Sequence, residues 1–113
     1  DCEASAKLIG DFLGVKPIIA YQSKYGKSKW IGPSLLSVLS ELSSEHKKIV
    51  VATPAFTADN LETIYEIDEE AREYFESLGG KELVRVPCLN DSESWVKTFA
   101  HEILPKLSYR PLE

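Results

Sequence analysis

The stretch IVVATPAFTADNLETIYEIDEEAREYFESLGG, residues 49–80, decides the fold class. Its first five residues, IVVAT, are an unbroken apolar run, which is typical of a strand in the middle of a parallel sheet. Pro54 ends the strand, and a helix is expected from Asp59 to Leu78, because apolar residues recur there at helical spacing: Leu61, Ile64, Ile67, Ala71, Tyr74, Phe75 and Leu78. A glycine pair then ends the helix. A strand followed by a helix is the building unit of parallel α/β sheets.

Elements of the same two kinds alternate on either side of this stretch. Helices are predicted over 4–13, over 34–46 and over 91–104, the last with Trp95, Phe99 and Ile103 on its inner face. Strands are predicted at PIIAYQ (17–22) and ELVRVPC (82–88). The order α-β-α-β-α-β-α predicts an α/β fold with three layers, α/β/α, around a parallel sheet, and residues 1–113 are expected to form a single domain.

Composition excludes several classes of protein. A net charge of -5 over 113 residues argues against a nucleic-acid partner, because phosphate binding needs a clustered excess of Lys and Arg. We find no apolar stretch long enough for a membrane span and no signal peptide. Cys2 and Cys88 lie far apart without a CxxC pattern, which argues against a zinc site or a disulfide framework. We therefore expect a cytoplasmic protein.

The tripeptide GKS at 26–28 suggests a nucleotide-binding P-loop, but its context does not fit. The first glycine of that motif should stand at position 21, which is Tyr21, and the next helix begins only after Pro33. We interpret the segment as a Lys-rich turn. It contains Trp30, which is costly to expose in a polar loop. The residues alone leave open whether Trp30 closes a core or contacts a flat ligand.

Three carboxylates are spaced four residues apart on the long helix. Glu62, Glu66 and Glu70 fall along one side of it, and Asp59 adds a carboxylate at the first turn. A solvated helix face is the ordinary interpretation. Because like charges at this spacing repel, metal binding or proton transfer is the alternative, and the position just after a strand favours it. His46 and His101 are expected to be solvated.

Three segments together resemble the ferrochelatase family. YQSKYGKSKWIGPS (21–34) resembles its segment with QS, a basic residue, a variable residue, glycine and then W-L-x-P. TPAFTADNLETIYEIDEEAREYF (53–75) resembles P-x-F-x-x-D-x-x-E-T-x-x-E-x-D, and VPCLNDSESWVKTFAHEI (86–103) is similar to the closing P-x-L-N strand and last helix. The order and spacing agree over nearly the whole chain. The resemblance implies a chelatase-like, Rossmann-like half-domain that inserts ferrous iron into a porphyrin in haem biosynthesis.

The resemblance also implies roles for particular residues. Glu62 would be the active-site carboxylate for metal binding or proton acceptance, with Asp59 and Asn60 in the same catalytic cluster. Some family members carry histidine, and others cysteine, at the position of Asn60. Glu66 and Glu70 would continue the metal-handling acidic column away from the pocket. The porphyrin contacts would be Ser23, Lys24, Trp30 and Phe56. Iron and porphyrin are substrates, and no prosthetic group is expected.

Part of the family pattern lies outside this sequence. The family's second principal catalytic residue, a histidine in an S-A-H type motif, would precede Asp1, and the family's N-terminal domain would form the other wall of the cleft. We therefore expect a C-terminal domain that is inactive alone and whose partner is that missing domain; peripheral membrane contact of the full-length enzyme stays open. The alternative is a non-catalytic porphyrin- or metal-binding module, including a homodimeric small chelatase.

Overall fold

The computed structural model describes residues 2–22 and 32–107. Helix α1 (Cys2–Leu13) comes first, followed by α2 (Leu35–Leu42) and strand β1 (Lys48–Val51). A long helix then runs without interruption through α3 (Leu61–Thr63), η1 (Ile64–Ala71) and α4 (Arg72–Ser77). Strand β2 (Glu82–Arg85) precedes a terminal helix made of α5 (Glu93–Thr98), η2 (Phe99–Ile103) and η3 (Leu104–Lys106).

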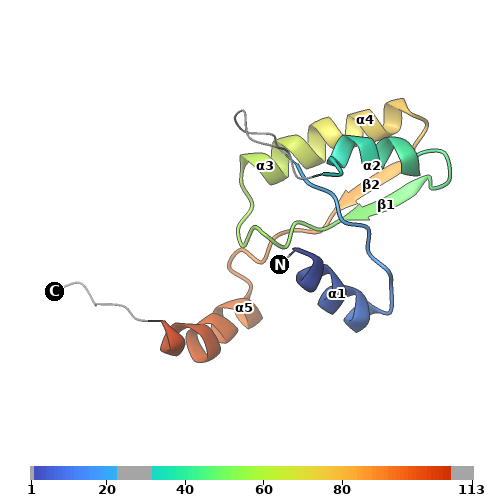
Figure 1. The fold of residues 1–113 in the computed structure, drawn as a ribbon. Coiled ribbons are helices and arrows are strands. Elements are labelled where there is room, and N and C mark those ends of the chain that lie inside the picture. The colour runs from blue at the N-terminus through green and yellow to red at the C-terminus, as the bar shows by residue number, and fades with distance from the viewer. Residues whose placement is uncertain (1, 23–31, 108–113) are drawn as a thin grey trace.

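Strands β1 and β2 form a parallel pair, as the sequence predicts for two of its three strands. Ile49 pairs with Leu83, and Val51 pairs with Arg85. These residues alternate with Val50 and Val84, whose side chains are exposed. Because successive side chains on a strand point to opposite faces, one face of the pair is covered and the other is open. In Figure 1, α2 and the long helix lie over one side of the two strands.

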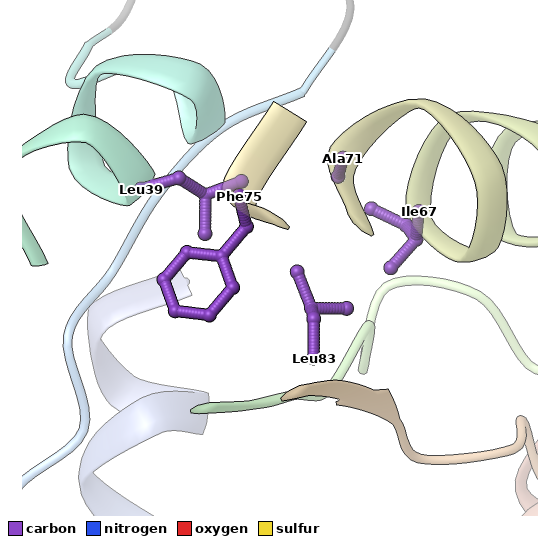
Figure 2. Packing of buried hydrophobic residues seen from close by; sticks show 5 residues of the cluster. All are labelled: Leu39, Ile67, Ala71, Phe75 and Leu83. Carbon is purple, nitrogen blue, oxygen red and sulfur yellow. The ribbon is translucent and has the colours of Figure 1, made fainter. Parts of the chain in front are cut away.

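The core joins the long helix to α2 and β2. Its buried members are Leu39, Ile67, Ala71, Phe75 and Leu83, and Figure 2 shows the Phe75 ring between Leu39 and Leu83. Phe75 is fully buried. A methyl group at Gly80 would overlap the Phe75 ring, so the turn after α4 passes close over the core. Ile49 and Val51 of the apolar run pack against this core. In the described residues the run belongs to a two-stranded sheet and exposes Val50, so it is not the middle strand that the sequence predicts.

The predicted strand at 17–22 is wrong. Only Tyr21 pairs with another segment there, in a single parallel bridge to Ser34. Tyr21 N donates to Pro33 O at 2.9 Å, and Leu35 N donates to Tyr21 O at 2.8 Å. The backbone is thus paired with the residues that lead into α2, and it does not extend the β1–β2 ladder.

The three-layer arrangement is not confirmed. Within the described residues, α1 packs against no other helix or strand, and α5 contacts only the η2 segment that continues it. Both stand apart from the strands in Figure 1. Phe12 of α1 is 90% exposed and Val50 of β1 is 71% exposed. The described part of the chain is therefore a mixed α/β unit with helices over one face of its sheet.

The long helix departs from the predicted 3.6-residue period. Its middle part, η1, is a π-helix, with i→i+5 hydrogen bonds. Three members of the predicted stripe, Leu61, Ile64 and Leu78, are exposed, whereas Thr63 is buried. The fully or almost fully buried residues are four apart: Thr63, Ile67, Ala71 and Phe75. A step of four residues is about 40° more than one full α-turn and somewhat less than one π-turn. In a helix that contains α- and π-turns the two deviations offset each other, so the four buried residues stay on one face.

Predictions for the terminal helix and the two histidines have mixed outcomes. Trp95 and Phe99 contact each other, with ring centroids 5.8 Å apart, but no other element covers them within the described residues. His46 and His101 are exposed, as expected. None of the helices in the described part of the chain is long and apolar enough to cross a membrane.

Candidate functional site

The loop between β1 and the long helix ends in a helix cap. Asn60 is the N-cap, and its Oδ1 accepts hydrogen bonds from Glu62 N at 2.9 Å and Thr63 N at 3.2 Å. Thr63 Oγ1 in turn accepts from Asn60 N at 3.0 Å, which completes a capping box. This cap fixes where the helix begins. It places Glu62 in the first turn of the helix that follows β1.

The acidic column contacts Gln22, the last residue of the segment predicted as the first strand. Gln22 Nε2 donates to Glu62 O at 3.1 Å and to Glu66 Oε2 at 3.0 Å. Glu62 and Glu66 are half-buried, and Glu70 is exposed. One amide side chain therefore spans two successive turns of the helix on the side that carries the column.

An open groove lies beside this contact, between the start of α2 and the long helix. Its volume is about 540 Å³, and its lining residues are Tyr21, Gln22, Ser34, Leu35, Leu36, Glu66, Glu70 and Tyr74. Burial raises the pKa of Tyr21 above its ordinary value. The groove therefore combines apolar walls with two carboxylates of the column.

Asp59 is bound on both of its carboxylate oxygens. Oδ1 accepts from Arg85 Nη1 and from Cys88 N at 3.3 Å, and Oδ2 accepts from Asn90 Nδ2 at 2.8 Å. Asn90 Oδ1 also accepts from Asp59 N at 2.8 Å. The hydrogen bonds from Asn90, Cys88 and Arg85 outweigh desolvation and hold the pKa of Asp59 well below its usual range. This carboxylate is ionised at neutral pH.

The structure brings some of the predicted site residues together. Asp59, Asn60 and Glu62 lie in one cap and first turn, and Glu66 and Glu70 follow along the helix. Phe56 is half-buried in the loop after β1, where its N donates to Thr53 O at 3.0 Å. Ser23, Lys24 and Trp30 lie outside the described residues. Within 2–22 and 32–107, no three His, Cys, Asp or Glu side chains are grouped closely enough to hold a metal ion.

Sequence reasoning missed the partners of Asp59. Arg85 lies in a predicted strand and Asn90 precedes a predicted helix, and no local pattern links either residue to Asp59. The same holds for Asp68, the second carboxylate that Arg85 binds. The segment ELVRVPC contains an indication of such a pair. Arg85 falls on the same strand face as Leu83, and a buried arginine needs a carboxylate partner. The pattern could not say which of the many acidic residues would supply it.

The fold and the site together define an α/β unit whose acidic residues and helix cap follow the carboxyl end of a parallel strand. Comparison with known proteins then gives the family. The family model described as ferrochelatase matches residues 1–107, so the chain belongs to the ferrochelatase family.

Individual relatives agree with the family match. The chain is 44% identical to proteins named ferrochelatase from Pseudomonas entomophila (strain L48) and Pseudomonas putida (strain W619), over 103 residues in each case. These matches cover 88% of this chain and 31% of each relative. A ferrochelatase from Vibrio parahaemolyticus is 38% identical over 110 residues, which is 34% of its length. The chain thus spans about a third of the length of these relatives.

Proposed function

We propose that this chain is the C-terminal domain of a ferrochelatase and that Glu62 handles metal and protons while ferrous iron enters a porphyrin. The observation that carries the proposal is the position of Glu62. It lies in the capped first turn after β1, at the edge of a parallel sheet where α/β proteins bind ligands. Membership of the family supplies the class of reaction.

The chemistry of metal insertion suits this carboxylate. A free porphyrin must lose its pyrrole protons before its nitrogens can hold a divalent cation, so a base must be near the ring. Iron must also be released to the ring, which requires a few exchangeable oxygen ligands. In the described part of the chain, the Glu62 carboxylate has no hydrogen-bond or ion-pair partner in the protein, which supports a role toward a substrate.

The remaining predicted residues divide into two groups. Glu66 and Glu70 extend the metal-handling column, and the hydrogen bond from Gln22 holds Glu66 in line with the turn that carries Glu62. Asn60 contributes through the cap that orients Glu62. Ser23, Lys24, Trp30 and Phe56 are proposed porphyrin contacts.

We propose that the rest of the longer polypeptide completes the cleft. Large apolar side chains are exposed on α1 and on the open face of the strands, among them Leu8, Phe12, Val50 and Val84. Exposure of this kind usually marks a surface that another part of a protein covers. The same surface favours the second candidate, a homodimer of this chain that binds porphyrin between its copies. Light scattering combined with a porphyrin titration separates the two candidates. A homodimeric module should have twice the mass of the chain and bind porphyrin tightly, whereas an isolated domain should be a monomer that binds porphyrin weakly.

A chimera tests the proposed function. This chain would replace the matching 103-residue region of the Pseudomonas entomophila relative, so that the rest of the cleft is supplied by a family member. Insertion of ferrous iron into mesoporphyrin would be followed by absorbance. We expect the chimera to be active, the chain alone to be nearly inactive, and Glu62→Gln to lower kcat about 100-fold or more, as for loss of a general base.

The matched control is Glu69→Gln, which removes an exposed carboxylate from the same helix. It should leave kcat within about twofold, because a surface charge away from the site makes little difference. Glu62→Gln activity equal to that of the wild-type chimera would contradict the proposed role. Comparable iron insertion by the chain alone, abolished by Glu62→Gln, would contradict the need for a second domain.

A further inference from the structure

Arg85 joins the start of the long helix to its π-helical middle. Arg85 Nε donates to Asp68 Oδ1 and Nη2 donates to Asp68 Oδ2, both at 3.0 Å, which is the bidentate geometry of a strong pair. The remaining Nη1 donates to Asp59 Oδ1. The Arg85 side chain is only 10% exposed. One guanidinium therefore fixes two points of the helix relative to the end of β2.

A short chain of hydrogen bonds leads from Asp59 to Glu62. Thr63 is fully buried, and its hydroxyl lies 3.3 Å from Asp59 Oδ1 and 3.1 Å from Asn60 O, so it can donate to either. The same hydroxyl accepts from Asn60 N, and Asn60 Oδ1 accepts from Glu62 N. The capping box holds the side chains of Asn60 and Thr63 that make these hydrogen bonds. A shift of Asp59 would therefore move Thr63 and Asn60, and with them the backbone of Glu62.

Asp59 is poorly placed to carry a proton. Donors on Arg85, Cys88 and Asn90 point at its oxygens, so a proton arriving on either oxygen would meet an N–H group already directed there. The carboxylate would also lose its ion pair with Arg85. These contacts favour the charged form strongly, as the lowered pKa of Asp59 also indicates. A fixed negative charge is the role that this geometry supports.

We propose that Arg85 and Asp59 are positioning residues, which set the first turn of the helix and so the carboxylate of Glu62, and that Asp59 is a fixed anion rather than a proton carrier. The proposal rests on the proposed function, because it assigns a role relative to Glu62. It separates two neighbouring carboxylates that the family resemblance groups in one catalytic cluster. Glu62 takes part in the reaction, whereas Asp59 keeps the first turn of the helix in position.

Enzyme kinetics of the chimera described above test the proposal. We expect Arg85→Lys, which keeps the charge but loses the fork, and Asp59→Asn each to lower kcat about tenfold, because small misplacements of a reacting group are costly. The double variant should be less impaired than the product of the two single effects, since both changes break the shared Arg85–Asp59 contact. The pH dependence of kcat should keep its shape in all three, because the reacting carboxylate is unchanged.

A matched control comes from the same pair of strands. Lys48 and Glu82 form an exposed ion pair at 3.7 Å at the opposite end of the β1–β2 ladder, and Lys48→Gln should leave kcat unchanged. The proposal is overturned if Asp59→Asn removes activity as completely as Glu62→Gln while Arg85→Lys has no effect. It is equally overturned if Asp59→Asn moves a limb of the pH profile, because a proton carrier would do so.

A second measurement keeps this proposal separate from the proposed function. Amide hydrogen exchange in the chimera, followed by mass spectrometry over peptides that contain 58–66, reports on the first turn whether or not the protein inserts iron. We expect about tenfold faster exchange there in Arg85→Lys and Asp59→Asn, and no change in Glu62→Gln or Lys48→Gln. Unchanged exchange in Arg85→Lys would overturn the positioning role. Normal kcat in Glu62→Gln would instead overturn the proposed function alone.

Discussion

The two ends of the long helix are held by different forces. At its carboxyl end, Ala71 and Phe75 are fully buried against α2 and β2, and the contacts are apolar. At its amino end, Asp59, Asn60 and Arg85 make hydrogen bonds and ion pairs, and the neighbouring Leu61 is 74% exposed. Apolar packing holds the helix on the sheet, but it does not depend on direction. Hydrogen bonds do, so they can orient a side chain.

This division suits a helix that carries a site at one end only. The carboxyl end supplies the stability, and the amino end can then use polar groups that contribute little net stability. The π-helical segment lies between the two ends, and it keeps Thr63 on the same buried face as Phe75 although their surroundings differ. Changes at the carboxyl end should therefore unfold the domain, whereas changes at the amino end should reorient the site.

The largest expected effect is that of Phe75→Ala. The ring is fully buried among Leu39, Leu83 and the turn at Gly80, so its removal leaves a cavity. We expect the free energy of unfolding to fall by about 3–5 kcal/mol, which is enough to unfold most single domains of modest stability. Urea denaturation of the chain, followed by far-UV circular dichroism, measures it. A loss below 1 kcal/mol would show that the carboxyl end is not the stabilising one.

Gly80→Ala tests the same end with a smaller change. The added methyl group would overlap the ring of Phe75, and either the turn or the ring must move. We expect a loss of about 1–3 kcal/mol, as for other overpacked cores. Gly14→Ala provides a contrast, because a methyl group there would meet no atom and its cost comes from the φ of 69° alone. A more stable Gly80→Ala variant would contradict the packing of the turn.

Asn60→Ala moves the test to the amino end. The variant loses the side-chain oxygen that accepts from Glu62 N and Thr63 N, and we expect a cost of about 1 kcal/mol. Asn60→Asp restores the acceptor and should recover most of that loss. Thermal unfolding of the two variants provides the comparison. A larger loss from Asn60→Ala than from Phe75→Ala would reverse the division between the two ends.

The sequence predicted the apolar end of the helix better than the polar end. Ile67, Ala71 and Phe75 were expected to be buried and are, because burial follows from a pattern that apolar residues reveal along the chain. Leu61 and Ile64 at the amino end and Leu78 in the last turn were expected to be buried and are exposed. The periodicity assumed 3.6 residues per turn throughout, and the π-helical segment changes which residues face the sheet.

The site itself was predicted only in part, for a different reason. Glu62 was singled out by its four-residue spacing from Glu66, and Asn60 by the family resemblance, and the structure places both in the capped first turn. Arg85 finds Asp59 and Asp68 only after β2 pairs with β1, and many acidic residues were available to it. Side-chain pairs between distant segments depend on the fold, and one sequence alone does not choose among them. The hydrogen bonds of Gln22 to the acidic helix are of the same kind.

The smallest expected effect is on the pH dependence of stability, and it comes from Asp59. Hydrogen bonds from the Asn90 side chain, from Cys88 and from Arg85 of β2 hold the pKa of Asp59 below the value of about 3.9 in an unfolded chain, although Asp68 of η1 shares the same guanidinium.

Because the folded state binds the proton only at lower pH, the stabilisation is complete above about pH 4 and is lost as the pH falls further. Asp59→Asn should therefore be less stable than the wild type at about pH 6, and the difference should shrink as the pH falls below about 4 toward the lowered pKa of the folded state. Thermal unfolding across this range measures the difference, with Asp91→Asn as a control for an exposed carboxylate. A difference that stays constant with pH would mean that Asp59 contributes through shape alone, and the amino end of the helix would then not depend on charge.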